Sequence, residues 1–164
     1  MFMCLRTFCF IIANSNETSQ KEDYFMSDAF PRFYLITLDF EGNKEEYLAA
    51  LEASLKNGIR LVQFRSKNLD LDTYKALATD VVKLAHQYDG KVLLNGPKEL
   101  LDEIDEDGIH FTSAAIANET TRPLPEKYIV SVACHNLEQI QNANKIKPDF
   151  AVLCPVFTTP SSPR

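Results

Sequence analysis

From residue 33 onward, short apolar runs alternate with stretches in which apolar residues recur at helical spacing. Six apolar runs are predicted β-strands: 33–38, 59–65, 91–95, 108–111, 128–134 and 150–157. Helices are predicted over 44–56, 70–88, 97–104 and 137–143. Short connections between strands and helices indicate parallel pairing, because each crossover must return to the same sheet. The pattern therefore predicts an α/β fold, either an open doubly wound sheet or part of a barrel.

The N-terminal region departs from this alternation. Residues 1–13 are apolar with one arginine, but this stretch is too short to cross a bilayer and makes a poor signal peptide. A polar stretch follows, and Met26 then precedes the first clear strand. We expect residues 1–30 to be an extension that is disordered or assigned from a wrong start codon, with Met26 as the functional start. Residues 31–164 then form the domain.

Composition and charge narrow the class of protein. Apolar residues make up 45% and charged residues 24% of the 164 residues, which is typical of a globular domain. The net charge of −6 argues against nucleic-acid binding, which needs a basic surface. The four cysteines match no zinc-binding spacing and are expected to be reduced. We therefore expect a cytoplasmic protein without membrane or nucleic-acid partners, although a small anionic substrate is compatible with the charge.

Polar residues stand at the ends of several predicted strands, where functional groups collect in parallel α/β folds. Gln63, Arg65 and Lys67 alternate out of the second strand, so that all three can point to one side. Guanidinium and ammonium groups beside an amide suit a phosphate or diphosphate. The alternative is a solvated strand end, which the spacing by itself does not exclude.

Further candidates follow later strands. Asn95 ends the third strand and His135 follows the fifth, and each could contact a substrate or simply cap a turn. Hydroxyl groups come after the sixth strand, among them Thr159 and Ser161. No glycine-rich nucleotide-binding motif follows any strand, so nucleotide-binding versions of the fold lose support.

The order of these elements resembles the thiamine phosphate synthase/TenI family. The segments that carry the resemblance, within residues 33–159, are YLIT, LVQFRSKN, KVLLNG, DGIHF, SVACHNLEQI and FAVLCPVFTT. The resemblance implies a TIM-type (β/α) barrel that acts in thiamine biosynthesis. Synthases of this family join a pyrimidine diphosphate to a thiazole phosphate with the help of Mg²⁺, whereas TenI relatives tautomerise a thiazole carboxylate phosphate.

The resemblance also assigns roles to residues. Matched position by position, it implies diphosphate and pyrimidine contacts for Gln63, Arg65, Lys67 and Asn95, and thiazole-phosphate contacts for two hydroxyls, Thr159 and Ser161. It further implies proton transfer by His135, the histidine after the fifth strand. The implied partner is thus a small phosphorylated thiazole or pyrimidine.

Two departures from the family pattern concern the metal. The positions of the two Mg²⁺-binding aspartates of a synthase are Gly96 and Ala115 here, and neither side chain can coordinate a cation. We therefore expect no metal site and no cofactor. Synthase chemistry loses support because it depends on Mg²⁺, whereas Asn95 followed by Gly96 is a pair that TenI-type members also show.

The number of strands suggests an incomplete barrel. A TIM barrel has eight βα units and at least about 200 residues, and this chain offers about six units in 164 residues. An incomplete barrel leaves open strand edges, so we expect poor stability of the monomer unless a homo-oligomer or another chain covers the gap.

Three functions remain open at this point. The first is a TenI-like or degenerate synthase domain, acting as a transferase or an isomerase. The second is a non-catalytic phosphate-binding module, or an inactive fragment of a longer protein such as one fused to a Nudix domain. The third is a pseudogene product without function.

Overall fold

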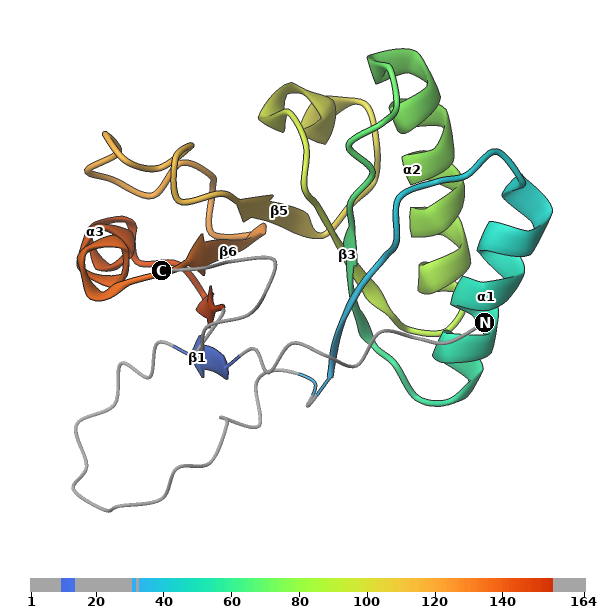
Figure 1. The fold of residues 1–164 in the computed structure, drawn as a ribbon, viewed down its shortest axis with the longest axis horizontal. Helices are drawn as coiled ribbons and strands as arrows, with labels where there is room; N and C mark the ends of the chain where they lie inside the picture. The colour runs from blue at the N-terminus through green and yellow to red at the C-terminus, as the bar shows by residue number, and fades with distance from the viewer. Residues whose placement is uncertain (1–9, 14–30, 32, 155–164) are drawn as a thin grey trace. The chain divides into compact units, whose positions relative to one another are not determined.

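The computed structural model describes residues 10–13, 31 and 33–154, and the chain divides into two compact units (Figure 1). One unit is Asp28–His110, and the other combines Met1–Ser27 with Phe111–Arg164. Each unit has strands, at least one helix and buried apolar residues of its own.

The unit Asp28–His110 is built from parallel strands joined by helices. In chain order its elements are β2 (Tyr34–Ile36), α1 (Lys44–Lys56), β3 (Leu61–Phe64), α2 (Leu71–His86), β4 (Lys91–Leu94), the 3-10 helix η1 (Lys98–Asp102) and β5 (Gly108–Phe111), whose last residue falls in the other unit. The strands lie in the order β5-β4-β3-β2, and each neighbouring pair is parallel. Sequential strands joined through helices thus pair as the pattern predicted.

The register of this sheet fixes which residues share a row. Gln63 of β3 pairs with Ile36 of β2 on one side and with Leu93 of β4 on the other, and Leu93 pairs with Gly108 of β5. All four residues of β3 are buried. Burial on both faces explains why this parallel strand reads as a nearly continuous apolar run.

Helices α1 and α2 lie side by side in Figure 1, and α2 packs on β3 and β4. The side chain of Asn43 caps α1 by accepting from the backbone N–H of Glu46 at 3.1 Å, and Asp70 caps α2 by accepting from Thr73 at 2.9 Å. Both helices lie close to their predicted bounds. Among the described residues no helix is long and apolar enough to cross a membrane.

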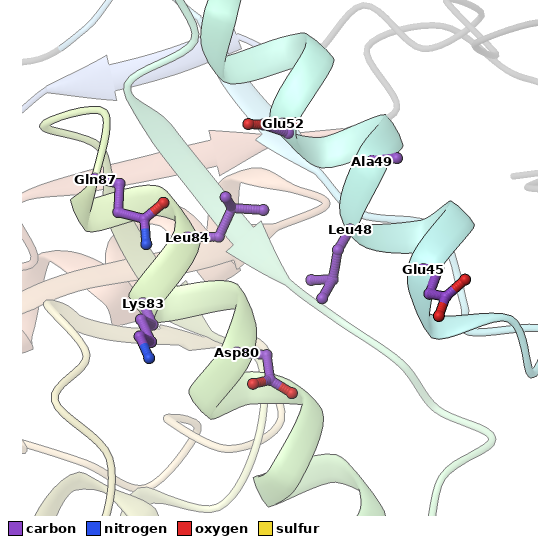
Figure 2. Close-up of a pocket in the computed structure, with 8 residues that line it drawn as sticks. All are labelled: Glu45, Leu48, Ala49, Glu52, Asp80, Lys83, Leu84 and Gln87. Atoms are coloured by element: carbon purple, nitrogen blue, oxygen red, sulfur yellow. The ribbon is translucent and has the colours of Figure 1, made fainter.

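Two leucines of α2 lie outside its fully buried face. Leu71 is 55% exposed and Leu84 is half-buried. Alanines 78 and 85 are fully buried instead, because their small side chains let the helix approach the sheet closely. Figure 2 shows Leu84 facing Leu48 of α1 across a shallow groove between the two helices, whose rim carries mostly acidic groups.

The helix predicted over 97–104 is shorter and tighter than expected. Only Lys98–Asp102 is helical, and it is a 3-10 helix. No side chain caps its start at Pro97. Its tight turn still buries Leu100, and Ile104 just beyond it is also buried. The prediction of a helix in this segment was therefore right about its position but wrong about its kind and length.

The other unit contains β1 (Phe10–Ala13), β6 (Ile129–Cys134), α3 (Leu137–Ile146) and β7 (Phe150–Leu153). Its strand order is β1-β7-β6, with β6 parallel and β1 antiparallel to β7. The side chain of Asn136 caps α3, which ends at Lys147 with a φ of 48°. Cys134 is a buried free thiol, and burial raises its pKa.

Strand β1 lies within residues 1–30, the predicted N-terminal extension. It pairs with the whole of β7, from Phe10 opposite Leu153 to Ala13 opposite Phe150. The remaining residues of that range lie outside the described ones, as do Cys4 and Cys9. The extension and the start at Met26 therefore stay predictions.

An aspartate directly before β5 fastens that strand to β4 at its amino end. The backbone N–H of Asp107 donates to the carbonyl of Val92 at 3.0 Å, and its Oδ2 accepts from the N–H of Val92 at 2.8 Å. His86, at the end of α2, lies 3.0 Å from the same oxygen through Nε2. One carboxylate thus joins two strands and a helix end.

The second unit repeats this arrangement. Asp149, directly before β7, exchanges the same two contacts with Val130 of β6, at 2.8 and 2.7 Å. A basic side chain again contacts the aspartate, since Arg122 Nη2 lies 2.6 Å from Oδ2 of Asp149. Arg122 also donates to the carbonyl oxygens of Tyr128 and Lys147, both at 2.8 Å. The amino ends of these strands are therefore closed by structural contacts.

Candidate functional site

Beyond the carboxyl ends of β2, β3 and β4, the backbone ladder continues for one more step. The N–H of Thr37 donates to the carbonyl of Gln63 at 3.0 Å, and the N–H of Asn95 donates to the carbonyl of Phe64 at 2.9 Å. Because the strands are parallel, the residues that follow each of them leave the sheet at one common edge. This carboxyl edge carries four predicted site residues, Gln63, Arg65, Lys67 and Asn95.

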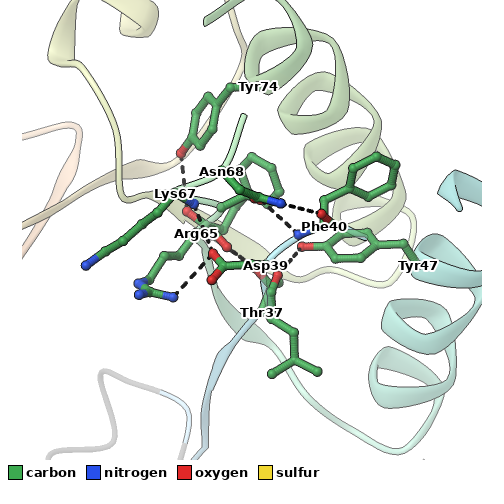
Figure 3. A network of polar contacts seen from close by, with 11 residues as sticks. Thr37, Asp39, Phe40, Tyr47, Arg65, Lys67, Asn68 and Tyr74 are labelled. Carbon is green, nitrogen blue, oxygen red and sulfur yellow. Dashed lines mark hydrogen bonds and ion pairs between the residues drawn. The ribbon is translucent and has the colours of Figure 1, made fainter. Parts of the chain in front are cut away.

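Side chains take over where the backbone ladder stops (Figure 3). The hydroxyl of Thr37 accepts from the N–H of Arg65 at 3.0 Å and donates to the carbonyl of the same residue at 3.2 Å. Asp39 Oδ1 accepts from the N–H of Lys67 at 2.9 Å. The loop after β3 is thus tied to the loop after β2 at every second residue.

A further set of contacts closes the far end of the two loops. The N–H of Phe40 donates to the hydroxyl of Ser66 at 2.9 Å, and that hydroxyl donates to Asn68 Oδ1 at 2.7 Å. Asn68 Nδ2 donates to the carbonyl oxygen of Phe40 at 2.6 Å. Ser66 is buried at 6% exposure. These three contacts fix the backbone that carries the two cations.

Arg65 and Lys67 project their charged groups from this fixed backbone. Figure 3 shows both side chains extending to the same side, away from the rings of Phe40 and Tyr47. Arg65 Nη1 lies 3.5 Å from Asp39 Oδ1, with the Arg65 side chain 30% exposed, and Lys67 is exposed. Two cations on an ordered loop can bind an oxyanion by charge-assisted hydrogen bonds.

A buried chain of polar groups leads inward from the edge. Gln63 is 2% exposed, and its Nε2 donates to the hydroxyl oxygen of Tyr34 at 3.0 Å. The hydroxyl of Tyr34 in turn lies 3.3 Å from Nδ1 of His110. Burial lowers the pKa of His110 to about 4, so its imidazole is neutral at neutral pH and can accept at Nδ1.

Tyr34, Asp39 and His110 are site residues that the sequence analysis did not select. His110 lies one step beyond the pair of Leu94 with Ile109. Alternation along registered parallel strands therefore puts it on the same face as Gln63. The alternation is present in the sequence, but it predicts that His110 and Gln63 share a face only once the register of the strands is known.

The residues present do not fit the Mg²⁺ ion of a synthase. Gly96 has no side-chain donor, and a Cβ atom there would lie 2.9 Å from the hydroxyl oxygen of Tyr74. Burial raises the pKa of Tyr74, whose hydroxyl donates to the carbonyl of Phe64 at 3.3 Å. Ala115, in the other unit, also lacks a donor, and the described residues contain no cluster of three metal-ligating side chains.

His135 lies in the other unit, at the turn between β6 and α3. Its backbone N–H donates to Gln139 Oε1 at 2.8 Å, and its Nδ1 contacts the carbonyl oxygen of Cys154. A carbonyl can only accept, so Nδ1 carries the hydrogen and Nε2 is the basic nitrogen of the neutral ring. Thr159 and Ser161 lie outside the described residues.

The fold and this edge define an α/β class of protein in which two basic side chains, Arg65 and Lys67, stand on the loop beyond a parallel strand. A comparison with known families sharpens that class. Residues 33–164 match the family described as thiamine monophosphate synthase, TMP-TENI, and the chain belongs to this family. The predicted resemblance is confirmed.

Individual relatives carry related names. The chain is 35% identical over 134 residues to "Putative thiamine-phosphate synthase 2" of Aquifex aeolicus, covering 81% of this chain and 71% of the relative. It is 23% identical to a thiamine-phosphate synthase of Fusobacterium nucleatum, covering 78% and 63%. It is 30% identical to one of Nostoc sp., covering 79% and 36%. The chain thus spans between 36% and 71% of these relatives' lengths.

A solved structure is similar in fold. Thiamine phosphate pyrophosphorylase from Pyrococcus furiosus superimposes with a TM-score of 0.52 at 18% identity, over 68% of this chain and 54% of that chain. At this identity the likeness concerns the fold alone. It confirms the predicted α/β class, an incomplete TIM-type barrel.

The neutral buried imidazole predicts a specific loss of stability in mild acid. The pKa of His110 is about 4 in the folded chain and 6.5 in the unfolded one, so unfolding between these values takes up a proton. Near pH 5 this group alone should lower the free energy of unfolding by about 1.4 kcal/mol for each unit by which the pH is lowered. Urea unfolding at several pH values should show a shallower slope for His110→Gln than for the wild type and for His135→Gln. Equal slopes would contradict the prediction.

The contact at Gly96 predicts that the cost of Gly96→Ala depends on the residue at position 74. Gly96→Ala should lower the free energy of unfolding by about 1–3 kcal/mol, because the added methyl group meets the ring of Tyr74. The cost should persist in a Tyr74→Phe background, since ring carbons also lie 3.0 Å from the Cβ position. It should disappear in a Tyr74→Val background, measured relative to that variant by urea unfolding. Equal costs in all backgrounds would show that Tyr74 is not the obstacle.

Proposed function

We propose that the unit Asp28–His110 binds the phosphate group of a phosphorylated thiazole or pyrimidine at its carboxyl edge. The observation that carries the proposal is the pair of cations, Arg65 and Lys67, on a loop fixed by side-chain hydrogen bonds. Pre-ordering matters because the loop then loses little conformational entropy when an anion binds. The relatives named thiamine-phosphate synthases supply the substrate class.

The reaction that this chain supports best is proton transfer of the TenI type. Synthase chemistry needs a metal to neutralise the leaving pyrophosphate, and Gly96 with Tyr74 above it offers no ligand there. Tautomerisation only moves a proton within one molecule, so a base that accepts and returns that proton suffices. His135 is the candidate, with Nδ1–H held by the carbonyl of Cys154 and Nε2 as the basic atom.

A second candidate is a module that binds phosphates without turnover. It needs only the cations and the polar chain through Gln63, which all belong to the unit Asp28–His110, and it does not need His135. Binding by Arg65 and Lys67 would persist in such a module, and only turnover separates the two proposals.

Binding can be tested by titrating the full chain in a calorimeter with a thiazole phosphate and, separately, with a pyrimidine phosphate. Arg65→Gln and Lys67→Gln should each weaken binding by about tenfold, because each removes a charge-assisted hydrogen bond. Lys91→Gln is a matched control, since this exposed lysine lies at the amino end of β4. Equal affinities for all four proteins would overturn the proposed binding site.

Turnover can be tested with a thiazole carboxylate phosphate, followed by the change in ring absorbance. His135→Ala should lower kcat at least about 100-fold while KM changes little, because the ring exchanges a proton rather than binding the phosphate. His86→Gln, which alters a histidine at the other edge of the sheet, should retain activity. Unchanged turnover in the His135 variant would remove it from the mechanism. Binding without turnover in the wild type would favour the non-catalytic module.

A further inference from the structure

We propose that Asp39 sets the charge preference of the anion site, so that the site favours a monophosphate over the more highly charged diphosphate. The inference rests on the proposed phosphate binding by Arg65. It assigns to Asp39 a specificity-determining and positioning role, acting through the guanidinium and through the field at the site.

The position of Asp39 gives it two separable contacts. Its Oδ1 accepts from the backbone N–H of Lys67 at 2.9 Å and lies 3.5 Å from Arg65 Nη1. The first contact needs only an acceptor oxygen, which an asparagine would also provide. The second depends on the negative charge. Asp39→Asn therefore removes the charge while it keeps the acceptor for the loop.

The loop does not depend on that charge for its shape. Thr37 holds Arg65 through both backbone groups, at 3.0 and 3.2 Å. Phe40 is held by Ser66 at 2.9 Å and by Asn68 at 2.6 Å. Contacts on both sides of Asp39 thus keep the two loops together, and an isosteric change at 39 should leave the fold intact.

The charge opposes an anion in two ways. An oxyanion that binds Arg65 must compete with the carboxylate for the same guanidinium, and it must also approach the carboxylate itself. Asp39 is 46% exposed, so water screens the repulsion without abolishing it. Coulomb repulsion grows with the charge of the ligand. A diphosphate is therefore penalised more than a monophosphate.

The carboxylate also has a use when no ligand is bound. It keeps the guanidinium of Arg65 close to the site, and the side chain pays less entropy on binding than a free arginine would. A monophosphate can then be bound at modest cost.

The test compares two simple probes, orthophosphate and pyrophosphate, by calorimetric titration of the full chain. We expect Asp39→Asn to tighten pyrophosphate binding by about tenfold and orthophosphate binding by about threefold, which are effects of the size of a screened charge pair. Asp105→Asn, which removes the same charge from an exposed loop before β5, should change neither affinity. A merely structural role would alter both probes alike.

The remaining outcomes are distinguishable. If the wild type binds pyrophosphate, Arg65→Gln weakens it, and Asp39→Asn leaves the ratio of the two affinities unchanged, the role of Asp39 is overturned and the binding site stands. If the wild type binds neither probe, and Arg65→Gln also leaves the affinity for a thiazole or pyrimidine phosphate unchanged, both this inference and the proposed function fail. Circular dichroism and thermal unfolding of Asp39→Asn check that the loops remain folded, and the salt dependence of its affinity gives a second measure of the lost charge.

Discussion

The arrangement of the candidate site depends on how the hydrogen-bond ladder of the parallel sheet ends. Backbone polar groups that leave a sheet still need partners, and here hydroxyl, carboxylate and amide groups supply them. The side chains of Thr37 and Asp39 hydrogen-bond to the backbone of Arg65 and Lys67 in the neighbouring loop. The loops after β2 and β3 therefore stay paired beyond the end of the sheet. Arg65 and Lys67 thus belong to a loop whose backbone is hydrogen-bonded to the loop after β2.

Polarity changes steeply along β3. Gln63 lies fully inside, joined through Tyr34 to the neutral imidazole of His110, while Arg65 two residues later is partly exposed and charged. Low dielectric surroundings favour neutral hydrogen-bonded groups, and solvent at the edge tolerates full charges. A buried neutral amide and a partly exposed cation therefore lie within a few residues of each other. The opposite ends of the strands carry aspartates, Asp107 and Asp149, engaged in structural contacts.

Much of the fold could be predicted, because strands buried on both faces leave an apolar run in the sequence and helices leave a periodic one. All six expected strands are present, and α1 has the predicted bounds. In the segment 97–104 the kind of helix was predicted wrongly, since apolar spacing does not distinguish a short 3-10 helix from an α-helix. At the candidate site, alternation along β3 led to the prediction of Gln63, Arg65 and Lys67, whose roles stay predictions. Asp39 was not predicted, because its partner Lys67 is 28 residues away in the sequence and their contact depends on the register between the two loops.

The close packing of Tyr74 over Gly96 has a consequence for the substitutions that these two positions can accept. A carboxylate at position 96 requires the ring to be smaller or elsewhere, and a smaller residue at 74 leaves a cavity in the core for as long as position 96 remains glycine. Each change alone is unfavourable, and only the two together keep the packing. Positions 74 and 96 are therefore coupled, so that the residue tolerated at one depends on the residue at the other.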